Sequence, residues 1–219
     1  MKYPCLVLDH DDTLVNSSAT IHYPSFIAFL KKARPEMGEK YSFEDYILRN
    51  FDPGYYPFCR EELRYTDGEM AEEYEFWKQF VKERVPQAYP GWREILEEHK
   101  RQGGIITVVS HSLSENIYRD YEKNGLPKPD AVYGWELPPE HRKPNTWPLE
   151  QIMTRFSLTP EELIMVDDLK PGYDMASAAG VDFAAAGWAY NVPEIEAFMR
   201  KNVKTYCKTI NELREYLDE

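Results

Sequence analysis

Three carboxylates lie within four positions near the beginning of the chain, immediately after a short apolar run. The run spans residues 5–8, and Asp9, Asp11 and Asp12 follow it. Such a run predicts a short buried strand, and because Asp is disfavoured within strands, the carboxylates should lie where the strand leaves the sheet. Ligands of open α/β sheets bind at that edge. Since neighbouring carboxylates repel unless a cation or a proton compensates them, we expect a divalent metal site with one carboxylate left for chemistry.

Two other interpretations of this stretch have to be weighed. A calcium loop of the EF-hand type needs Gly at its sixth position and Glu at its twelfth. Those positions hold Leu14 and Thr20, so calcium fits badly. A solvated Asp-rich turn stays open on this stretch alone, because Asp is common where a strand turns.

Two further predicted strands end in polar residues. The β-branched run 105–109 is typical of a strand buried on both faces, and Ser110 follows it. The apolar run 163–166 ends at Asp167 and Asp168. Because the carboxyl ends of parallel strands share one edge of the sheet, we expect these side chains to converge with the first acidic cluster.

Lys143 lies between these two strands, shortly before the helix expected over residues 147–156. A surface lysine at a helix start is the alternative, but a cation is unfavourable there unless an anion is close. Carboxylate ligands without His or Cys favour a hard ion, and Mg²⁺ fits best. A hydroxyl, a lysine and free backbone N–H groups can hold a phosphate. This inventory predicts a site that moves a phosphoryl group.

The elements that must position these residues alternate regularly from residue 90 onward. Alternating helices and strands predict an α/β fold with a parallel, doubly wound sheet. The expected strands are 5–8, 105–109, 131–135, 163–166, 181–186 and a short one near 205–206, and the expected helices are 92–100, 114–123, 147–156, 175–179, 193–201 and 210–217.

The segment 17–88 differs in character and predicts an inserted all-α domain, with residues 1–16 and 89–219 forming the core. It is rich in Tyr, Phe, Glu and Lys, with an expected helix cap at Ser42 and a loop over 51–57. An apolar stripe at helical spacing indicates one long helix facing the inside of a helical bundle, not a cofactor site. The stripe consists of Met70, Tyr74, Trp77, Phe80 and Val81.

The amino-acid composition limits the classes of partner that the protein is expected to bind. The 219 residues carry a net charge of −12, which disfavours nucleic acid and anionic membranes because both bind basic faces. No apolar run reaches the roughly 18 residues of a membrane span, and no signal peptide precedes the first strand. The three cysteines, Cys5, Cys59 and Cys207, are widely spaced. We therefore expect reduced thiols and a cytoplasmic protein.

Taken in order, the motifs resemble those of the haloacid dehalogenase (HAD) superfamily of phosphohydrolases. The D-x-D-x-T motif is Asp9 to Thr13, the strand-end Ser is Ser110, the lysine is Lys143, and the acidic motif begins at Asp167 and Asp168. The resemblance covers the whole core. It implies a Rossmann-like three-layer core with a parallel sheet, and a helical C1-type cap formed by the insert.

The resemblance also implies roles. Asp9 would be the nucleophile that forms an aspartyl phosphate, Asp11 the acid and base, and Lys143 a cation that stabilises Asp9 and the transferring group. Mg²⁺ would be held by Asp9, the Asp11 carbonyl and Asp168, with Asp167 binding directly or through water. The implied phosphate-binding residues are Ser110, His111 and Lys143. His10 receives no catalytic role, and the implied partner is a small phosphorylated metabolite.

Two departures from the family pattern matter. Asp12 stands where Gly is more usual, and Gly172 stands where many relatives carry a further Asp. The paired acids at the strand end are then the better metal candidates, and we expect Asp174 on a helix surface.

Related activities stay open at this stage. A phosphomutase would share every core residue, and a phosphonate hydrolase could use Lys31 or Lys32 as a Schiff base. A non-catalytic phospho-ligand-binding protein is a further alternative, whereas Asp11 and the paired acids argue against dehalogenation. Candidate specificity residues on the cap are Tyr23, Tyr55, Tyr56, Arg49, Arg60 and Arg64.

Overall fold

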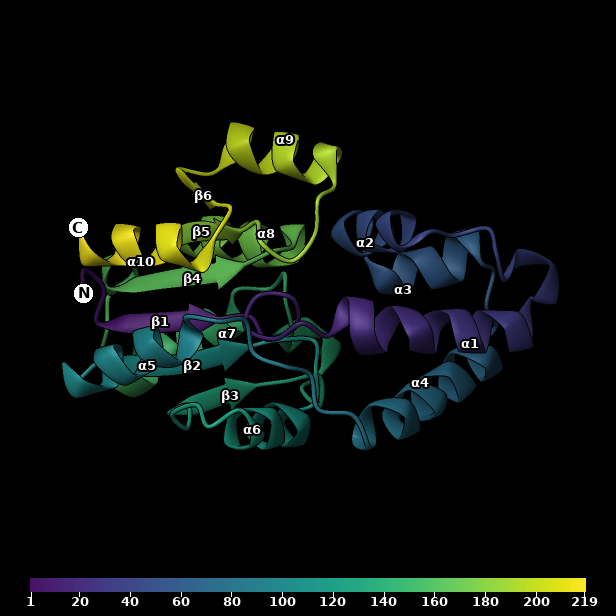
Figure 1. The fold of residues 1–219 in the computed structure, drawn as a ribbon, viewed down its shortest axis with the longest axis horizontal. Coiled ribbons are helices and arrows are strands. Elements are labelled where there is room, and N and C mark those ends of the chain that lie inside the picture. The colour runs from purple at the N-terminus through teal and green to yellow at the C-terminus, as the bar shows by residue number, and fades with distance from the viewer.

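A six-stranded parallel sheet forms the centre of the computed structural model, which describes residues 1–219 (Figure 1). Its strands are β1 (Cys5–Leu8), β2 (Ile105–Val109), β3 (Ala131–Tyr133), β4 (Leu163–Asp167), β5 (Asp182–Ala186) and β6 (Thr205–Cys207). Their order is β3-β2-β1-β4-β5-β6, and every neighbouring pair is parallel. The order reverses between β1 and β4, and open α/β sheets bind ligands at that point. The α/β prediction is confirmed.

Helices cover both faces of the sheet. Along β1, Cys5 and Val7 belong to one apolar cluster, and Leu6 and Leu8 belong to the other. The first face is covered by α7 (Trp147–Phe156), α8 (Lys170–Ala179) and α9 (Pro193–Asn202), and the second by α5 (Trp92–Arg101), α6 (Ser114–Lys123) and α10 (Ile210–Asp218). Because consecutive strand residues point to opposite faces, an apolar run with no polar alternation is what this three-layer arrangement requires.

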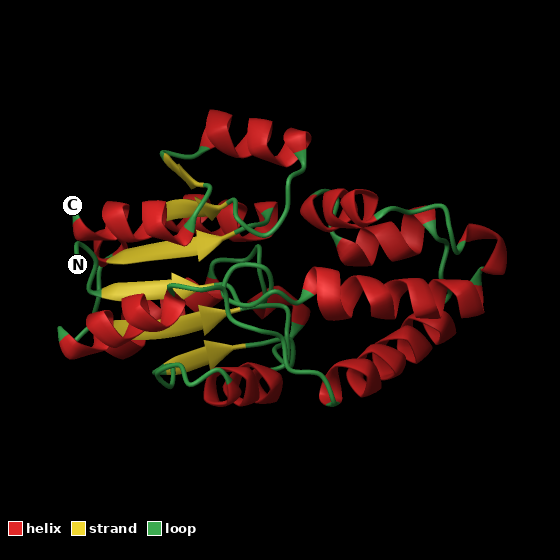
Figure 2. Cartoon of the chain, in the orientation of Figure 1, coloured by secondary structure: helices red, strands yellow, loops and turns green.

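The segment between β1 and α5 forms a group of helices, called here the helical insert (residues 18–82). It comprises η1 (Ser18–His22), α1 (Tyr23–Ala33), η2 (Pro35–Met37), α2 (Phe43–Phe51), α3 (Tyr55–Pro57), η3 (Phe58–Glu62) and α4 (Asp67–Lys82). It lies beyond the carboxyl ends of the strands (Figures 1 and 2). The expected cap at Ser42 is present and accepts the Asp45 N–H, and Thr66 caps α4 in the same way.

Three expected boundaries are wrong. The stretch 51–57 is helical at both ends, because Gly54 reverses the chain at φ 101° and Pro57 lies in the first turn, where its missing N–H is not needed. The expected helix 175–179 begins at Lys170, since Pro171 also fits a first turn. The strand expected over 131–135 ends at Tyr133.

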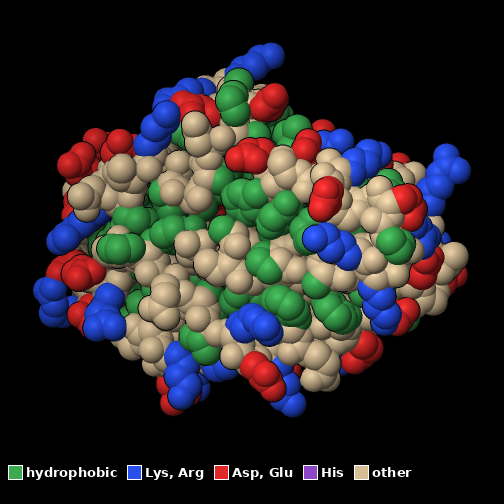
Figure 3. Space-filling model, turned by 45° about the vertical axis from the view of Figure 1, so that its right-hand side comes forward, with side chains coloured by type: hydrophobic (Ala, Val, Ile, Leu, Met, Phe, Trp, Pro, Cys, Tyr) green, Lys and Arg blue, Asp and Glu red, His purple; other side chains and the backbone are tan.

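Side chains of both charges are interspersed on the face shown in Figure 3. None of the helices combines the length and the apolar character needed to cross a bilayer.

Two indole rings fasten the loop that follows β1. The Nε1 atoms of Trp92 and Trp188 donate to the Thr13 carbonyl at 2.9 and 3.0 Å, and the rings pack edge to face. Trp92 is fully buried. The loop is therefore held from the core side by two donors that reach one backbone oxygen.

We expect Trp92→Ala to lower the free energy of unfolding by about 3–5 kcal/mol, because it leaves a large cavity. Trp188→Phe removes one hydrogen bond at a half-buried position and should cost about 1 kcal/mol. Urea denaturation followed by circular dichroism measures both. An equal or smaller loss for Trp92→Ala would contradict this account of the loop.

Candidate active site

A buried lysine joins the ends of two neighbouring strands. Leu8 is in register with Val166, so Asp9 and Asp167 lie side by side. Lys143 Nζ donates to Asp9 Oδ1 and to Asp167 Oδ2, both at 2.7 Å. All three side chains are at most 6% exposed. The surface alternative for Lys143 is therefore wrong.

Burial and neighbouring charges shift the pKa values of Asp9 and Lys143 in opposite directions. Burial raises the pKa of Asp9 to about 7, although Lys143 opposes the shift. Burial alone would lower the pKa of Lys143, but the carboxylates of Asp167 and Asp9 raise it above its usual value. Asp9 Oδ2 accepts no hydrogen bond, so one oxygen of this carboxylate is available to a ligand.

Asp168 completes a cluster of three buried carboxylates. Thr13 Oγ1 donates to Asp168 Oδ1 at 3.1 Å, and the Tyr190 hydroxyl donates to Oδ2 at 2.8 Å. Burial raises its pKa well above the usual range, and the charges of Asp167 and Asp9 add to the shift. Only neutral hydroxyls contact Asp168, so no cation compensates its charge.

A divalent metal ion fits this cluster. One oxygen from each of Asp9, Asp167 and Asp168 lies within 4.8 Å of the others. Three carboxylates and one ammonium leave an excess of negative charge in a buried place, and oxygen donors suit a hard cation. Both oxygens of Asp167 are already engaged, by Lys143 and by the Leu169 N–H at 2.8 Å. Both oxygens of Asp168 accept hydroxyls, so Asp9 Oδ2 is the one side-chain oxygen of the cluster that accepts no hydrogen bond.

Asp11 lies in a different environment. Ser112 Oγ donates to its Oδ2 at 2.6 Å, and His22 Nε2 lies 2.9 Å from its Oδ1. The Trp77 indole N–H reaches His22 Nδ1 at 3.0 Å. Despite burial, His22 holds the pKa of Asp11 well below its usual range.

The protonation of His22 is constrained from two sides. Burial lowers its pKa, but Asp11 opposes burial and the net shift is upward. The indole N–H is only a donor, so its contact requires an unprotonated Nδ1. The Trp77 contact therefore favours the neutral ring with its proton on Nε2, whereas the charge of Asp11 favours the protonated ring.

Asp12 takes no part in the carboxylate cluster. Its φ is 59°, in the left-handed region that favours Gly, which explains why Gly is more usual in this place. Its Oδ1 accepts the Ser18 N–H at 3.0 Å, and burial raises its pKa to about 6. Asp9 and Asp12 are both at least 95% buried, so the solvated-turn interpretation is wrong.

The loop after β2 lies beside the carboxylates. Leu8 is in register with Val108, so Ser110 lies next to the end of β1, and it is buried. Its Oγ accepts the Ser112 N–H at 3.2 Å. His111 is exposed, and its Nε2 lies 3.2 Å from the Lys143 carbonyl. This contact connects the loop after β2 to the loop that carries Lys143.

The departure from the family pattern at Gly172 also has a structural explanation. A Cβ on Gly172 would lie 2.1 Å from Asp167 Oδ2, so a carboxylate there would displace Asp167. Asp174 lies on the surface of α8 and pairs with Lys170 at 2.6 Å, as expected.

Several candidate specificity residues of the insert bind other side chains or backbone groups. Arg49 pairs with Glu62, and Arg60 pairs with Asp67 at 2.8 Å. Tyr23 donates to the Tyr41 carbonyl and Tyr55 donates to Glu73, both within the insert. The Tyr56 side chain is 58% exposed. His10 lies 3.1 Å from Asp120, away from Asp9, as expected.

Sequence reasoning did not identify some residues that contact the site. Thr13 belongs to the D-x-D-x-T motif and Ser112 follows Ser110 by two positions, so the sequence could have indicated both residues. The stripe residue Trp77 was assigned to packing, yet it bonds to His22. His22 and Tyr190 carry no local sequence signal, because only the fold brings them to Asp11 and Asp168.

Known proteins resemble the chain in sequence and in fold. Residues 6–186 match the family model described as haloacid dehalogenase-like hydrolase. A candidate haloacid dehalogenase-like hydrolase from Bacteroides fragilis superposes with a TM-score of 0.79 at 22% identity, covering 97% of this chain and 100% of that one. A predicted phosphoglycolate phosphatase from Haemophilus somnus gives 0.73 at 20% identity, covering 99% and 98%. These two similarities show a shared fold.

A local sequence similarity is also present. The tyrosine-protein kinase PtkA of Mycobacterium tuberculosis is 40% identical over 69 residues, which are 32% of this chain. The match spans 24% of that protein's length.

Lys143→Met should destabilise the metal-free protein by about 3–5 kcal/mol at pH 8, because it leaves buried carboxylates without their cation. A carboxyl whose pKa is raised by folding contributes stability below its unfolded pKa of about 4 and loses it as the pH rises through the folded value. The destabilisation caused by Lys143→Met should therefore be smaller at pH 5, where Asp9 binds a proton. Urea denaturation in EDTA at both pH values measures it.

Lys170→Met is the matched control, because it removes a partly exposed lysine that also pairs with an aspartate. It should change stability by less than about 1 kcal/mol at either pH. An equal loss for Lys143→Met at pH 5 and pH 8 would contradict the electrostatic account.

Proposed function

Because the chain belongs to the haloacid dehalogenase-like hydrolase family, we propose that it is a Mg²⁺-dependent phosphatase. It hydrolyses phosphate monoesters of small metabolites through an aspartyl-phosphate intermediate. The observation that carries the proposal is the contrast between two neighbouring carboxylates. Asp9 keeps one oxygen free beside Lys143 within the carboxylate cluster, whereas both oxygens of Asp11 are contacted, one by Ser112 and one by His22.

Asp9 is the nucleophile in this proposal. Its Oδ2 attacks phosphorus in line, and the bond from phosphorus to the leaving oxygen breaks, giving the aspartyl phosphate. Asp11 protonates the leaving oxygen and then removes a proton from the water that attacks the intermediate. That attack releases phosphate and restores the Asp9 carboxylate.

Phosphate oxygens would be bound by Ser110, by backbone N–H groups near His111, and by Lys143. Mg²⁺ would be held by Asp9, Asp168 and the Asp11 carbonyl, with Asp167 binding directly or through water. When bound, the ion supplies positive charge that offsets the repulsion between Asp9 and the phosphate. Lys143 keeps Asp9 oriented with one oxygen free.

Residues 17–88 act as the cap, and residues 1–16 and 89–219 form the catalytic core. A contact between the two parts supports this division, because His22 of the insert lies 2.9 Å from Asp11 of the core. Two donors on Asp11 keep it ionised, which is the form required of the base in the second step. Proton donation in the first step requires a protonated Asp11, so the contact with His22 must loosen before that step.

A phosphonate hydrolase of the Schiff-base type receives no support. Its lysine must be desolvated to become a nucleophile. Lys31 and Lys32 are both exposed on α1, and Lys32 pairs with Glu72.

We expect Asp9→Asn to lower the rate of phosphate release by at least about 10⁴-fold, because it removes the nucleophile. A panel of phosphorylated metabolites assayed with Mg²⁺, and again with EDTA, identifies a substrate and tests the need for metal. Asp174→Asn is the control, since it neutralises an acid on the surface of α8. Full turnover by Asp9→Asn would exclude the mechanism.

Asp11→Asn should slow both steps by about 10²–10⁴-fold, the usual contribution of a positioned acid or base. Ser112→Ala, which removes one donor to Asp11, should have a smaller effect. Rapid-quench kinetics separates formation of the intermediate from its hydrolysis. If only one step slows in Asp11→Asn, the proposal that one residue serves as both acid and base is wrong.

A further inference from the structure

One arginine of α6 holds the end of the helical insert. Arg119 Nη1 donates to the carbonyls of Val81 and Lys82 at 3.2 and 2.9 Å, and Nη2 donates to the Arg84 carbonyl at 3.0 Å. The first two carbonyls belong to the last turn of α4, whose carbonyls have no partners within the helix. A cation is favourable at that end of a helix. A single side chain therefore binds the end of the insert and the beginning of the segment that returns to the core.

Arg119 is itself held in place from the catalytic side. Its Nε donates to Asp120 Oδ1 at 2.8 Å, and Asp120 Oδ2 lies 3.1 Å from His10 Nε2. The Asp120 side chain is 4% exposed. His10 lies between Asp9 and Asp11 in the chain, so this network begins in the catalytic loop and ends on the insert.

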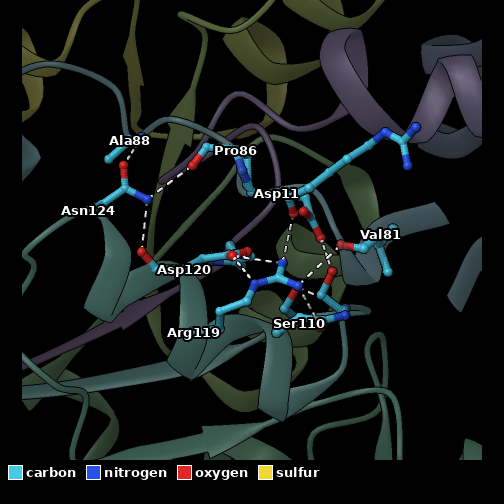
Figure 4. A network of polar contacts seen from close by, with 12 residues as sticks. Asp11, Val81, Pro86, Ala88, Ser110, Arg119, Asp120 and Asn124 are labelled. Atoms are coloured by element: carbon cyan, nitrogen blue, oxygen red, sulfur yellow. Dashed lines mark hydrogen bonds and ion pairs between the residues drawn. The ribbon is translucent and has the colours of Figure 1, made fainter. Parts of the chain in front are cut away.

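The return segment (residues 83–91) is held a second time, one turn further along α6. Asn124 Nδ2 donates to the Pro86 carbonyl at 3.0 Å, and Asn124 Oδ1 accepts the Ala88 N–H at 2.8 Å. Figure 4 shows Arg119 reaching Val81, with Asn124 beside Pro86 and Ala88. Asn124 also donates to the Asp120 carbonyl of α6 but makes no hydrogen bond to α4, so Arg119 is the contact that reaches α4 itself.

The position of α4 also determines the surroundings of Asp11. Trp77 of α4 donates to His22, and His22 contacts Asp11. The space beside Asp11, lined by His22, Val81, Ser112 and Arg119 among others, measures about 10 Å³. A cavity of that size holds about one water molecule. In the closed arrangement this side of Asp11 therefore has room for about one water molecule.

We propose that Arg119 is a positioning residue that clamps the insert closed and, through α4, Trp77 and His22, orients Asp11. Opening of the insert breaks the three carbonyl contacts together. Closing restores them and returns His22 to Asp11. The kinetic part of this inference rests on the proposed phosphatase function, whereas the conformational part does not.

Limited trypsin digestion tests the clamp without any substrate. Lys82 and Arg84 have exposed side chains, and their carbonyls belong to the bonds that trypsin would cut. Arg119→Gln should raise the rate of cleavage after these two residues by about tenfold or more, because cleavage follows the open population and several hydrogen bonds are lost. Arg119→Lys, which can bind fewer carbonyls, should give an intermediate rate.

Arg93→Gln is the matched control, because the Arg93 side chain donates to the Asn124 carbonyl but makes no hydrogen bond or ion pair with the insert or with residues 83–91. It should be cut at the wild-type rate. Wild-type rates for Arg119→Gln and Arg119→Lys would overturn the clamp, as would an equal increase for Arg93→Gln, which would indicate general loosening.

The effect on Asp11 is tested with p-nitrophenyl phosphate. Arg119→Gln should lower kcat more than it changes KM, and it should lower kcat no further in a His22→Ala background. Independent, multiplying effects of the two substitutions would overturn the path through His22. If the wild-type protein releases no phosphate, the proposed function fails, while the digestion result still decides the clamp.

Discussion

The ion pair of Lys143 with Asp9 and Asp167 is the interaction on which the site depends. It places a cation between two carboxylates that the sheet register holds side by side and removes from water. A buried ion pair of this kind contributes little net stability, but losing one partner is costly. Its consequence is chemical: one oxygen of Asp9 is fixed and the other is left free. Adjacent strand ends bring the two carboxylates together, and the loop before α7 brings Lys143 to them.

Two carboxylates separated by one residue become chemically distinct because they face different partners. Asp9 faces the lysine and the acids of β4, where burial keeps its pKa high. Asp11 faces α6 and the insert, where Ser112 and His22 keep it ionised. Asp12, the third acid of the stretch, occupies a left-handed position and ties the loop to the start of the insert. The insert therefore begins at the same loop whose acid it later contacts through His22.

Much of this could be predicted from the sequence because the decisive signals are local. Apolar runs of four or five residues that end in Asp or Ser predicted three of the six strands and their shared edge, and Lys143 was expected beside them. Contacts made over long distances carried no such signal. Trp77 matched a packing stripe, and only the tertiary structure directs its indole to His22. Arg49 and Arg60 of the insert were candidate specificity residues, but neighbouring acids already engage both.

The central claim is that Asp9 carries the phosphoryl group during turnover. Acid quenching of the enzyme during steady-state turnover, followed by peptide mass spectrometry, tests it most directly. The account predicts phosphate on the peptide containing Asp9, on that aspartate, and its disappearance once substrate is exhausted. Phosphate on another residue, or turnover with no phosphorylated peptide while a trapping control on a known aspartyl phosphate succeeds, would contradict it.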